Sequence, residues 1–228
     1  MRIQNADKNG NYDHGMFTKR NNDIEHRGRD MKQIWTECVN LCLESLQAGS
    51  LAIAAVITDA DGMIISRGRN QLFDAEESCN AVRNTLVSHA EINALANLPM
   101  PYRTARDLTL FTTVEPCPMC MGALAMSRIR NISVASQDLY AGATRLLEKD
   151  WYLAQKKFRV EFQKSEIEKT FTILHFVSLM VNRKLNLDHA FFTHNRAVYQ
   201  EYYEISREIS QHRDAVRHIT AHLYTCNE

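Results

Sequence analysis

Residues 107–126 have the sequence DLTLFTTVEPCPMCMGALAM, which sets a strand pattern directly before a helix pattern. The first part, Asp107–Val114, is rich in β-branched and aromatic residues and predicts a strand. Pro116 and Pro118 end that strand, and Pro118 suits the first turn of a helix, where a missing N–H costs little. We therefore expect a strand, a short loop and a helix over Met119–Met126.

The two cysteines of this stretch, Cys117 and Cys120, are predicted to lie at the N-terminus of that helix. The free N–H groups and the helix dipole at such an end favour thiolates. Upstream, His89-Ala90-Glu91 adds an imidazole and a carboxylate. A catalytic zinc keeps three protein ligands and leaves the fourth position to water. We therefore expect His89, Cys117 and Cys120 to hold Zn²⁺.

Glu91 is then the expected catalytic residue. Zinc lowers the pKa of a bound water to about 7, and a nearby carboxylate can carry its proton to a ring nitrogen and a departing amine. One alternative is structural, because Ser88 and Glu91 have the spacing of a helix capping box. The others are a redox cysteine pair and a structural zinc knuckle. The sequence contains both the His-x-Glu motif at His89 and the cysteine pair at Cys117. This combination favours a catalytic zinc site, because the two motifs together are more specific than either motif alone.

The residues from Leu110 to Leu124, continued by Ser127-Arg128-Ile129, are similar to those of the cytidine deaminase superfamily. The resemblance is strongest to its branch of tRNA adenosine deaminases and guanine deaminases, and it extends from about Trp35 to Asp150. It implies a three-layer α/β/α fold with a mixed five-stranded sheet. It also implies a zinc-dependent hydrolytic deaminase that removes ammonia from an amino-bearing nucleobase, with a purine base or nucleoside favoured.

The resemblance implies further site residues. Asn70 and Ala90 are the expected substrate-binding residues, although Asn70 also suits an ordinary turn after a strand. Glu115 is expected to support the loop. The chain departs from the family pattern at Ala54, where a glycine is common, and in a longer connection within residues 71–88. The methyl group of Ala54 would narrow the pocket, and the connection would shape specificity or be a surface insertion.

Charge and hydropathy restrict the function classes. Lys plus Arg and Asp plus Glu number 27 each, so no global basic field attracts nucleic acid. A small nucleobase or nucleoside is therefore favoured, and a tRNA adenosine deaminase is the alternative. A catalytically inactive, zinc-stabilised binding module is the alternative from another class. No membrane span or secretory signal is evident, so we expect a cytoplasmic protein, and the resemblance implies a homodimer.

We expect three regions along the chain. Residues 1–29 are polar and predict a flexible tail, residues 30–164 the deaminase domain, and residues 165–228 a helical C-terminal extension packed on the core or on a partner subunit. The other predicted elements are a helix from Met31 ending near Gly49, a hairpin of Ile53–Thr58 and Met63–Gly68, a helix over Ser88–Ala96, strands at Ile132–Ala135 and Phe158–Phe162, and helices at Glu166–Val181 and Ala197–Tyr224.

The remaining cysteines have no disulfide spacing and are expected to be inert thiols; they are Cys38, Cys42, Cys79 and Cys226. His218 and His222 are four residues apart on a predicted helix, where a polar face is favoured over a second metal site. Aromatic residues gather in the C-terminal third, and we expect some of them to pack on the core or a second subunit; they are Phe191, Phe192, Tyr199, Tyr202, Tyr203 and Tyr224.

Overall fold

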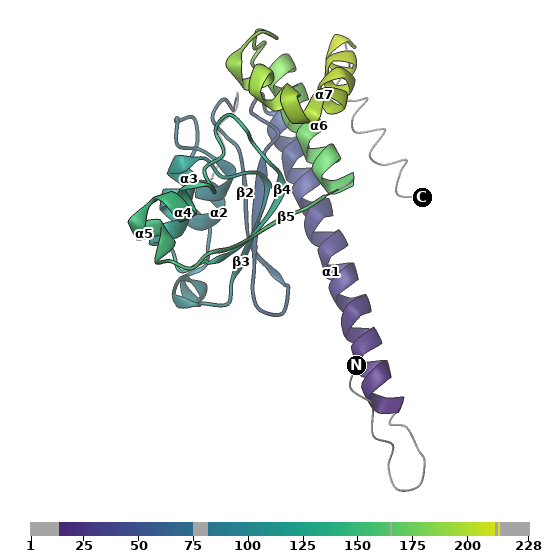
Figure 1. Cartoon of the computed structure of the whole chain (residues 1–228), viewed down its shortest axis with the longest axis vertical. Coiled ribbons are helices and arrows are strands. Elements are labelled where there is room, and N and C mark those ends of the chain that lie inside the picture. Colours follow the sequence, from purple (N-terminus) through teal and green to yellow (C-terminus); the bar gives the residue numbers. More distant parts are fainter. Residues whose placement is uncertain (1–13, 75–81, 165, 213, 215–228) are drawn as a thin grey trace, which may run out of the picture.

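The structure is a computed structural model that describes residues 14–74, 82–164, 166–212 and 214 (Figure 1). Its centre is a five-stranded sheet with strand order β2-β1-β3-β4-β5. β1 is antiparallel to β2 and β3, whereas β3, β4 and β5 are parallel to one another. The strands are β1 (Ala54–Thr58), β2 (Ile64–Arg69), β3 (Thr109–Val114), β4 (Asn131–Ser136) and β5 (Arg159–Phe162). The predicted mixed five-stranded sheet is confirmed.

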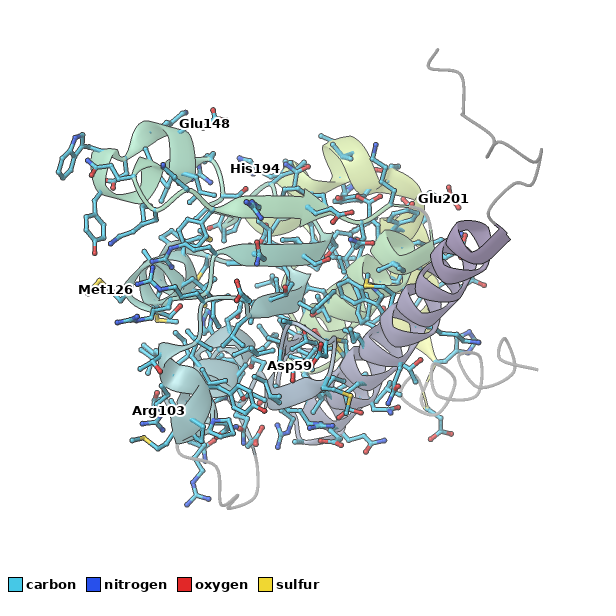
Figure 2. The ribbon with its side chains drawn as sticks, turned by 90° about the horizontal axis from the view of Figure 1, so that it is seen from below. Asp59, Arg103, Met126, Glu148, His194 and Glu201 are labelled. Atoms are coloured by element: carbon cyan, nitrogen blue, oxygen red, sulfur yellow. The ribbon has the colours of Figure 1, made fainter. Side chains whose placement is uncertain are left out.

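Helices cover both faces of this sheet. They are α1 (His14–Gln47), α2 (Ala90–Ala96), α3 (Pro118–Met126), α4 (Leu146–Lys149), α5 (Trp151–Ala154), α6 (Glu166–Val181) and α7 (Ala190–Gln211), with a 3₁₀ helix η1 (Met100–Thr104). Figure 2 separates the layers, with Arg103 and Met126 on one side of the sheet and Glu201 on the other. The predicted three-layer fold and its helical C-terminal part are therefore confirmed.

Strand alternation produces the two hydrophobic cores, because successive side chains of a strand point to opposite faces. Leu110 of β3 packs in the cluster with α2 and α3. Its neighbour Phe111 packs in the opposite cluster, formed with α1 and α6. There Trp35 of α1 contacts Phe111 and Phe171, with ring centroids 5.6 and 5.5 Å apart. The sheet therefore fixes α2 and α3 together on a single face.

Helix α7 packs on α6 through an aromatic cluster. Phe191, Phe192, Tyr199 and Tyr203 are buried in it with Phe176 of α6. These four C-terminal aromatic residues are therefore buried between α6 and α7, and their expected packing on the core or on a second subunit stays a prediction. Tyr224 lies outside the described residues. Among the helices that the structure describes, none combines the length and apolar character needed to cross a membrane.

Two element boundaries differ from the sequence predictions. Residues 14–29, expected in a flexible tail, form the first part of α1. Its Met, Lys, Arg and Glu residues are straight-chain helix formers, and the helix runs without a break into the predicted helix that begins at Met31. Helix α7 begins at Ala190 instead of Ala197, because Nδ1 of His189 accepts a hydrogen bond from the Phe191 N–H at 3.1 Å and caps the helix. The predicted helix end at Tyr224 lies outside the described residues.

Candidate metal centre

His89 stands at the start of α2, and this helix is pressed closely against β2. A Cβ atom on Gly68 would overlap the Ala90 carbonyl oxygen and the Ala94 backbone nitrogen, so only glycine permits this approach. The side-chain amide of Asn93 donates a hydrogen bond of 2.9 Å to the last carbonyl of β2. These contacts fix the position of His89 relative to the sheet.

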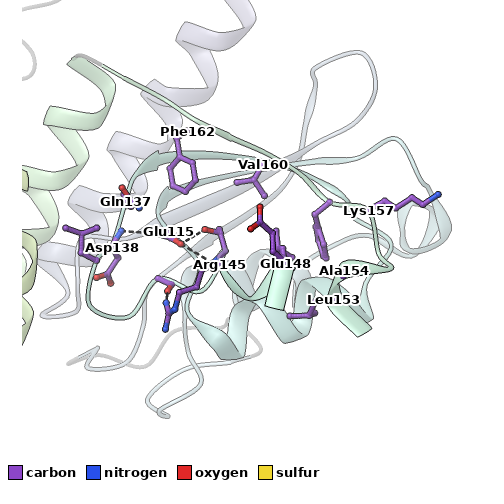
Figure 3. A pocket seen from close by; sticks show the side chains of 15 residues that line it. Glu115, Gln137, Asp138, Arg145, Glu148, Leu153, Ala154, Lys157, Val160 and Phe162 are labelled. Carbon is purple, nitrogen blue, oxygen red and sulfur yellow. Dashed lines mark hydrogen bonds between the residues drawn. The ribbon is translucent and has the colours of Figure 1, made fainter. Parts of the chain in front are cut away.

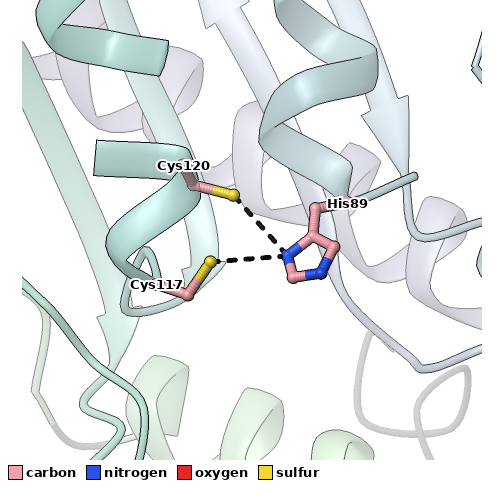
Figure 4. Close-up of side chains that lie close together, drawn as sticks. All are labelled: His89, Cys117 and Cys120. Atoms are coloured by element: carbon pink, nitrogen blue, oxygen red, sulfur yellow. Dashed lines mark hydrogen bonds between the residues drawn. The ribbon is translucent and has the colours of Figure 1, made fainter. Parts of the chain in front are cut away.

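Cys117 and Cys120 lie in the first turn of α3, as predicted. Cys117 is the N-cap residue, and Pro118 occupies the first helical position. Figure 4 shows both sulfur atoms facing the ring of His89, with Sγ of Cys117 3.7 Å and Sγ of Cys120 3.6 Å from Nδ1. The three ligand atoms lie within 4.8 Å of one another. One imidazole and two thiols are a donor set that suits zinc, so these side chains are positioned to bind this metal.

The electrostatics of the site separate its two thiols. A hydrogen bond from Cys120, followed by one from His89, lowers the pKa of Cys117 to about 4. The pKa of Cys120 is raised, first by this hydrogen bond with Cys117 and then by burial. The hydrogen bond with Cys117 also raises the pKa of His89. The Cys117 thiolate is thus favoured, and a thiolate is the form of cysteine that binds metal.

Glu91 is buried beside this cluster, with 4% of its surface exposed. Its Oε2 lies 3.4 Å from Sγ of Cys120, and its Oε1 lies 3.4 Å from the hydroxyl of Thr112 on β3. The pKa of the Glu91 carboxyl group is raised above its ordinary value, mainly because the group is buried. Burial thus favours the protonated form of this carboxyl group more than water does at an exposed glutamate.

The capping-box alternative for Glu91 is wrong. The N-cap residue of α2 is His89, and it has no side-chain capping bond. The hydroxyl of Ser88 belongs to the preceding turn, where it accepts a hydrogen bond of 3.3 Å from the Thr85 N–H. Glu91 therefore has no partner in a cap, and its carboxylate points to the cluster with Cys120.

Asn70 and Ala90 are both buried near the start of α2. Asn70 Oδ1 accepts a hydrogen bond of 3.2 Å from the Leu72 N–H, which is the turn role weighed for this residue. The N–H of Gln71, the residue between Asn70 and Leu72, donates a hydrogen bond of 2.9 Å to the Ser88 carbonyl. This bond holds the turn against the start of α2. Ala90 packs in the core between α2 and the sheet. Their substrate-binding roles stay predictions.

Ala54 does not lie on the side of the sheet that carries the cluster of His89, Cys117 and Cys120, contrary to what its comparison with a family glycine had suggested. It packs in the cluster with α1, on the face of the sheet opposite α2 and α3. Its N–H donates a hydrogen bond of 3.0 Å to the Thr113 hydroxyl. Its methyl group therefore fills the core beneath α1, which argues against the expected narrowing of the pocket. Residues 75–81 of the long connection lie outside the described residues.

Thr112 was missed by the sequence analysis. It shares a face of β3 with Leu110, which packs toward α2 and α3, and it is fully buried. Strand alternation alone would have placed its hydroxyl on the side of Glu91. A buried polar residue at a predicted inward position was the available signal.

The other cysteines agree with the expectation of inert thiols where the structure describes them. Cys38 and Cys42 are fully buried in α1 and form no disulfide. Burial raises the pKa of Cys42 to about 12 and that of Cys38 well above its ordinary value. Four further residues with expectations lie outside the described residues: Cys79, Cys226, His218 and His222.

Known proteins with similar sequences extend these observations. The chain is 39% identical over 108 residues to a tRNA-specific adenosine deaminase of Streptococcus pyogenes, which covers 46% of this chain and 62% of that protein. It is 37% identical over 112 residues to a tRNA(Ile)-lysidine synthase of Deinococcus radiodurans, which covers 47% of this chain and 17% of that protein. The chain thus spans less than two thirds of the length of these curated relatives.

A solved structure from a study of A-to-I editing by tRNA:A34 deaminases at the wobble position of transfer RNA also matches. It has 24% identity and a TM-score of 0.44, and the match covers 56% of this chain and 98% of that chain. Residues 29–136 match the family model described as the cytidine and deoxycytidylate deaminase zinc-binding region. This range includes His89, Glu91 and both cysteines of the cluster. Through these residues the chain is similar to the zinc-binding region of cytidine and deoxycytidylate deaminases.

Proposed function

We propose that this protein is a zinc-dependent hydrolytic deaminase of an amino-bearing nucleobase, with a purine base or nucleoside as its substrate. The observation that carries the proposal is the convergence of three metal-binding atoms with one buried carboxylate. His89, Cys117 and Cys120 supply the ligand atoms within 4.8 Å of one another. Glu91 stands 3.4 Å from the sulfur atom of Cys120. Three ligands and a free carboxylate are typical of catalytic zinc sites.

In this proposal some residues of the chain bind the metal and another transfers protons. His89, Cys117 and Cys120 hold the metal, which when bound supplies an activated water as nucleophile. Glu91 would take one proton from the attacking water and deliver it to a ring nitrogen. It would then take the remaining proton of the added hydroxyl group and deliver it to the amine, which departs as ammonia and leaves a ring carbonyl. Its burial supports this role, because desolvation raises the pKa of the carboxyl group and so favours its protonated form. The Thr112 hydroxyl lies 3.4 Å from the other oxygen of Glu91 and 3.0 Å from the Val114 carbonyl oxygen, so the two acceptors share its single proton.

The proposed purine substrate rests on sequence similarity. The residues around the cysteine pair resemble the purine-acting branch, and a curated relative at 39% identity is a tRNA-specific adenosine deaminase. That relative also favours a second candidate, an adenosine carried by tRNA. The equal numbers of acidic and basic residues argue for a small substrate instead. The homodimer that the resemblance implies stays a prediction.

A substrate panel tests the proposal. Purified protein containing one zinc per chain is assayed for ammonia release from guanine, adenosine and cytidine, and from a tRNA anticodon stem-loop. We expect turnover of a free purine substrate and loss of turnover in Glu91→Gln. If ammonia is released only from the stem-loop, the substrate is tRNA and not a free base or nucleoside. Turnover of cytidine alone would replace the purine.

The binding-module alternative makes a different prediction for the same variant. A zinc-stabilised module without catalysis would release no ammonia from any substrate of the panel. Glu91→Gln would then leave both zinc content and ligand binding as they are in the parent protein. The enzyme proposal requires instead that this variant keeps its zinc and loses a measured activity.

A further inference from the structure

Residues 137–144, which follow β4, are fastened to the loop that carries Cys117. The carboxylate of Glu115 is 6% exposed and gathers three hydrogen bonds from this segment. They come from the Asp138 N–H at 3.2 Å, the Thr144 N–H at 3.0 Å and the Thr144 hydroxyl at 2.5 Å. Glu115 lines a cavity of about 570 Å³. Figure 3 shows it there next to Asp138. Glu115 thus has the loop-supporting role expected from the sequence.

Two further features make this attachment tight. The Ala143 N–H donates a hydrogen bond of 3.0 Å to the carbonyl oxygen of Pro116, the residue directly before Cys117. A Cβ atom on Gly142 would overlap the Glu115 carboxylate, so the segment lies as close as a glycine allows. Both residues that precede Cys117 are therefore held by residues 137–144.

Asn195 of α7 holds the other side of the same segment. It is 1% exposed, and its Oδ1 accepts a hydrogen bond of 3.1 Å from the Leu139 N–H. Its amide group donates to Asp138 Oδ1 at 3.4 Å and to the Phe191 carbonyl at 3.0 Å. The same oxygen of Asp138 accepts from the N–H groups of two later residues of the segment, at 2.9 and 3.1 Å.

Tyr199, one turn further along α7, adds a second attachment. Its hydroxyl accepts a hydrogen bond of 3.3 Å from the Gln137 N–H and donates one of 2.8 Å to Glu168 of α6. Residues 137–144 therefore lie between α7 on one side and the Cys117 loop on the other. Both α7 and this segment lie beyond residue 136, where the match to the family model ends.

We propose that Asn195 is a positioning residue for the metal site, acting through Asp138 and residues 137–144 on the loop that carries Cys117. The inference rests on the proposed zinc site. Loss of the Asn195 side chain leaves the buried Asp138 carboxylate and the Leu139 N–H each short of a partner. The segment then holds Pro116 less firmly, and the Cys117 ligand moves more freely. Groups hydrogen-bonded directly to metal ligands typically contribute 10- to 100-fold to metal affinity, so we expect Asn195, which acts through intervening residues, to contribute at the lower end of that range.

The rate of zinc release to an excess of a chromophoric chelator tests this inference. For Asn195→Ala we expect release about tenfold faster than in the parent protein. Asn182→Ala is the matched control, because the amide of Asn182 also donates two hydrogen bonds, to the Leu46 and Ser50 carbonyls, but ties α6 to the end of α1. Asn182→Ala should release zinc at the rate of the parent protein, even if its Tm falls as much as that of Asn195→Ala.

A double-mutant cycle separates positioning through Asp138 from general stability. Asp138→Ala and Asn195→Ala each remove one partner of the hydrogen bond between the two side chains, and the double variant removes both. Because Asn195 acts through Asp138 in this inference, we expect the double variant to release zinc no faster than Asp138→Ala alone. The absorption of the cobalt(II)-substituted proteins, which reports thiolate coordination, should change in the same order.

Tyr199→Phe keeps the experiment decisive if Asn195→Ala does not fold, since it removes only one hydroxyl group, which binds the Gln137 N–H and Glu168. It should also release zinc faster than the parent protein. Equal release rates in the parent protein and the α7 variants would overturn the inference and leave the proposed function intact. A parent protein that binds no zinc would overturn both.

Discussion

Glu91 and Cys120 meet in the buried part of the site, with 3.4 Å between Oε2 and Sγ. The two residues come from different helices, since Glu91 lies in the first turn of α2 and Cys120 in the first turn of α3. Both helices pack on the same face of the sheet, so their N-terminal ends converge. A buried carboxyl group is thereby placed directly beside one of the two sulfur atoms of the cluster.

The first prediction concerns this carboxylate. Glu91→Gln keeps the shape of the side chain but removes its ability to carry a proton. We expect turnover to fall by about 10²- to 10⁴-fold, the usual contribution of a general acid or base, with zinc content unchanged. Ammonia release and metal analysis measure the two quantities. Glu161→Gln, on the exposed side of β5, is the control and should retain the parent turnover.

The second prediction concerns the metal ligands. Cys117→Ser replaces a sulfur atom whose pKa is lowered to about 4 by hydrogen bonds from Cys120 and His89. A serine hydroxyl does not ionise at neutral pH, so we expect the purified variant to contain far less than one zinc per chain. Its Tm should no longer rise with added zinc, because a ligand stabilises only the state that binds it. Cys42→Ala, at a buried thiol of α1, should retain stoichiometric zinc.

The third prediction concerns the contact between α2 and β2. An alanine at Gly68 would place its Cβ in the backbone of α2, at Ala90 and Ala94. We expect a loss of about 1–3 kcal/mol in the free energy of unfolding, which is typical of overpacking, together with reduced turnover. Gly122→Ala is a matched control on α3, where an added Cβ meets no atom within 4 Å. Denaturant unfolding measures the stability of both variants. Equal free energies of unfolding for Gly68→Ala and Gly122→Ala would contradict the prediction.

Local signals explain why much of the site could be predicted from the sequence. The prolines around Cys117 mark the end of a strand and the start of a helix, so the strand, loop and helix of residues 107–126 follow from neighbouring residues alone. The capping box failed because Ser88 and Glu91 have the right spacing, but Ser88 bonds to Thr85 instead. Spacing identifies candidates, whereas the competing turn decides which bond forms.

Long-range contacts explain what the sequence did not reveal. Asn195 lies 57 residues from Asp138 in the chain, and its role depends on how α7 packs on the segment after β4. A single asparagine on an amphipathic helix has no pattern that would indicate this contact. The start of α7 was likewise misplaced, because the cap at His189 uses an imidazole nitrogen instead of the usual oxygen.

The fourth prediction concerns stability at low pH. His175 of α6 is 7% exposed and packs against Phe191, with ring centroids 5.1 Å apart. Burial lowers the pKa of His175 to about 4, and the nearby Asp138 opposes this shift only in part. An unfolded histidine has a pKa of about 6.5, so between these values the unfolded state binds a proton that the folded state does not. The free energy of unfolding therefore falls as the pH is lowered through this range.

The size of the effect follows from the two pKa values. From pH 7 to pH 5 the His175 contribution should lower the free energy of unfolding by about 2 kcal/mol. His175→Phe keeps an aromatic ring in the cluster without a titrating group, so its unfolding free energy should depend less on pH by this amount. Urea unfolding of both proteins at pH 7, 6 and 5 measures the difference. Parallel curves would mean that His175 is protonated in the folded protein as readily as in the unfolded chain.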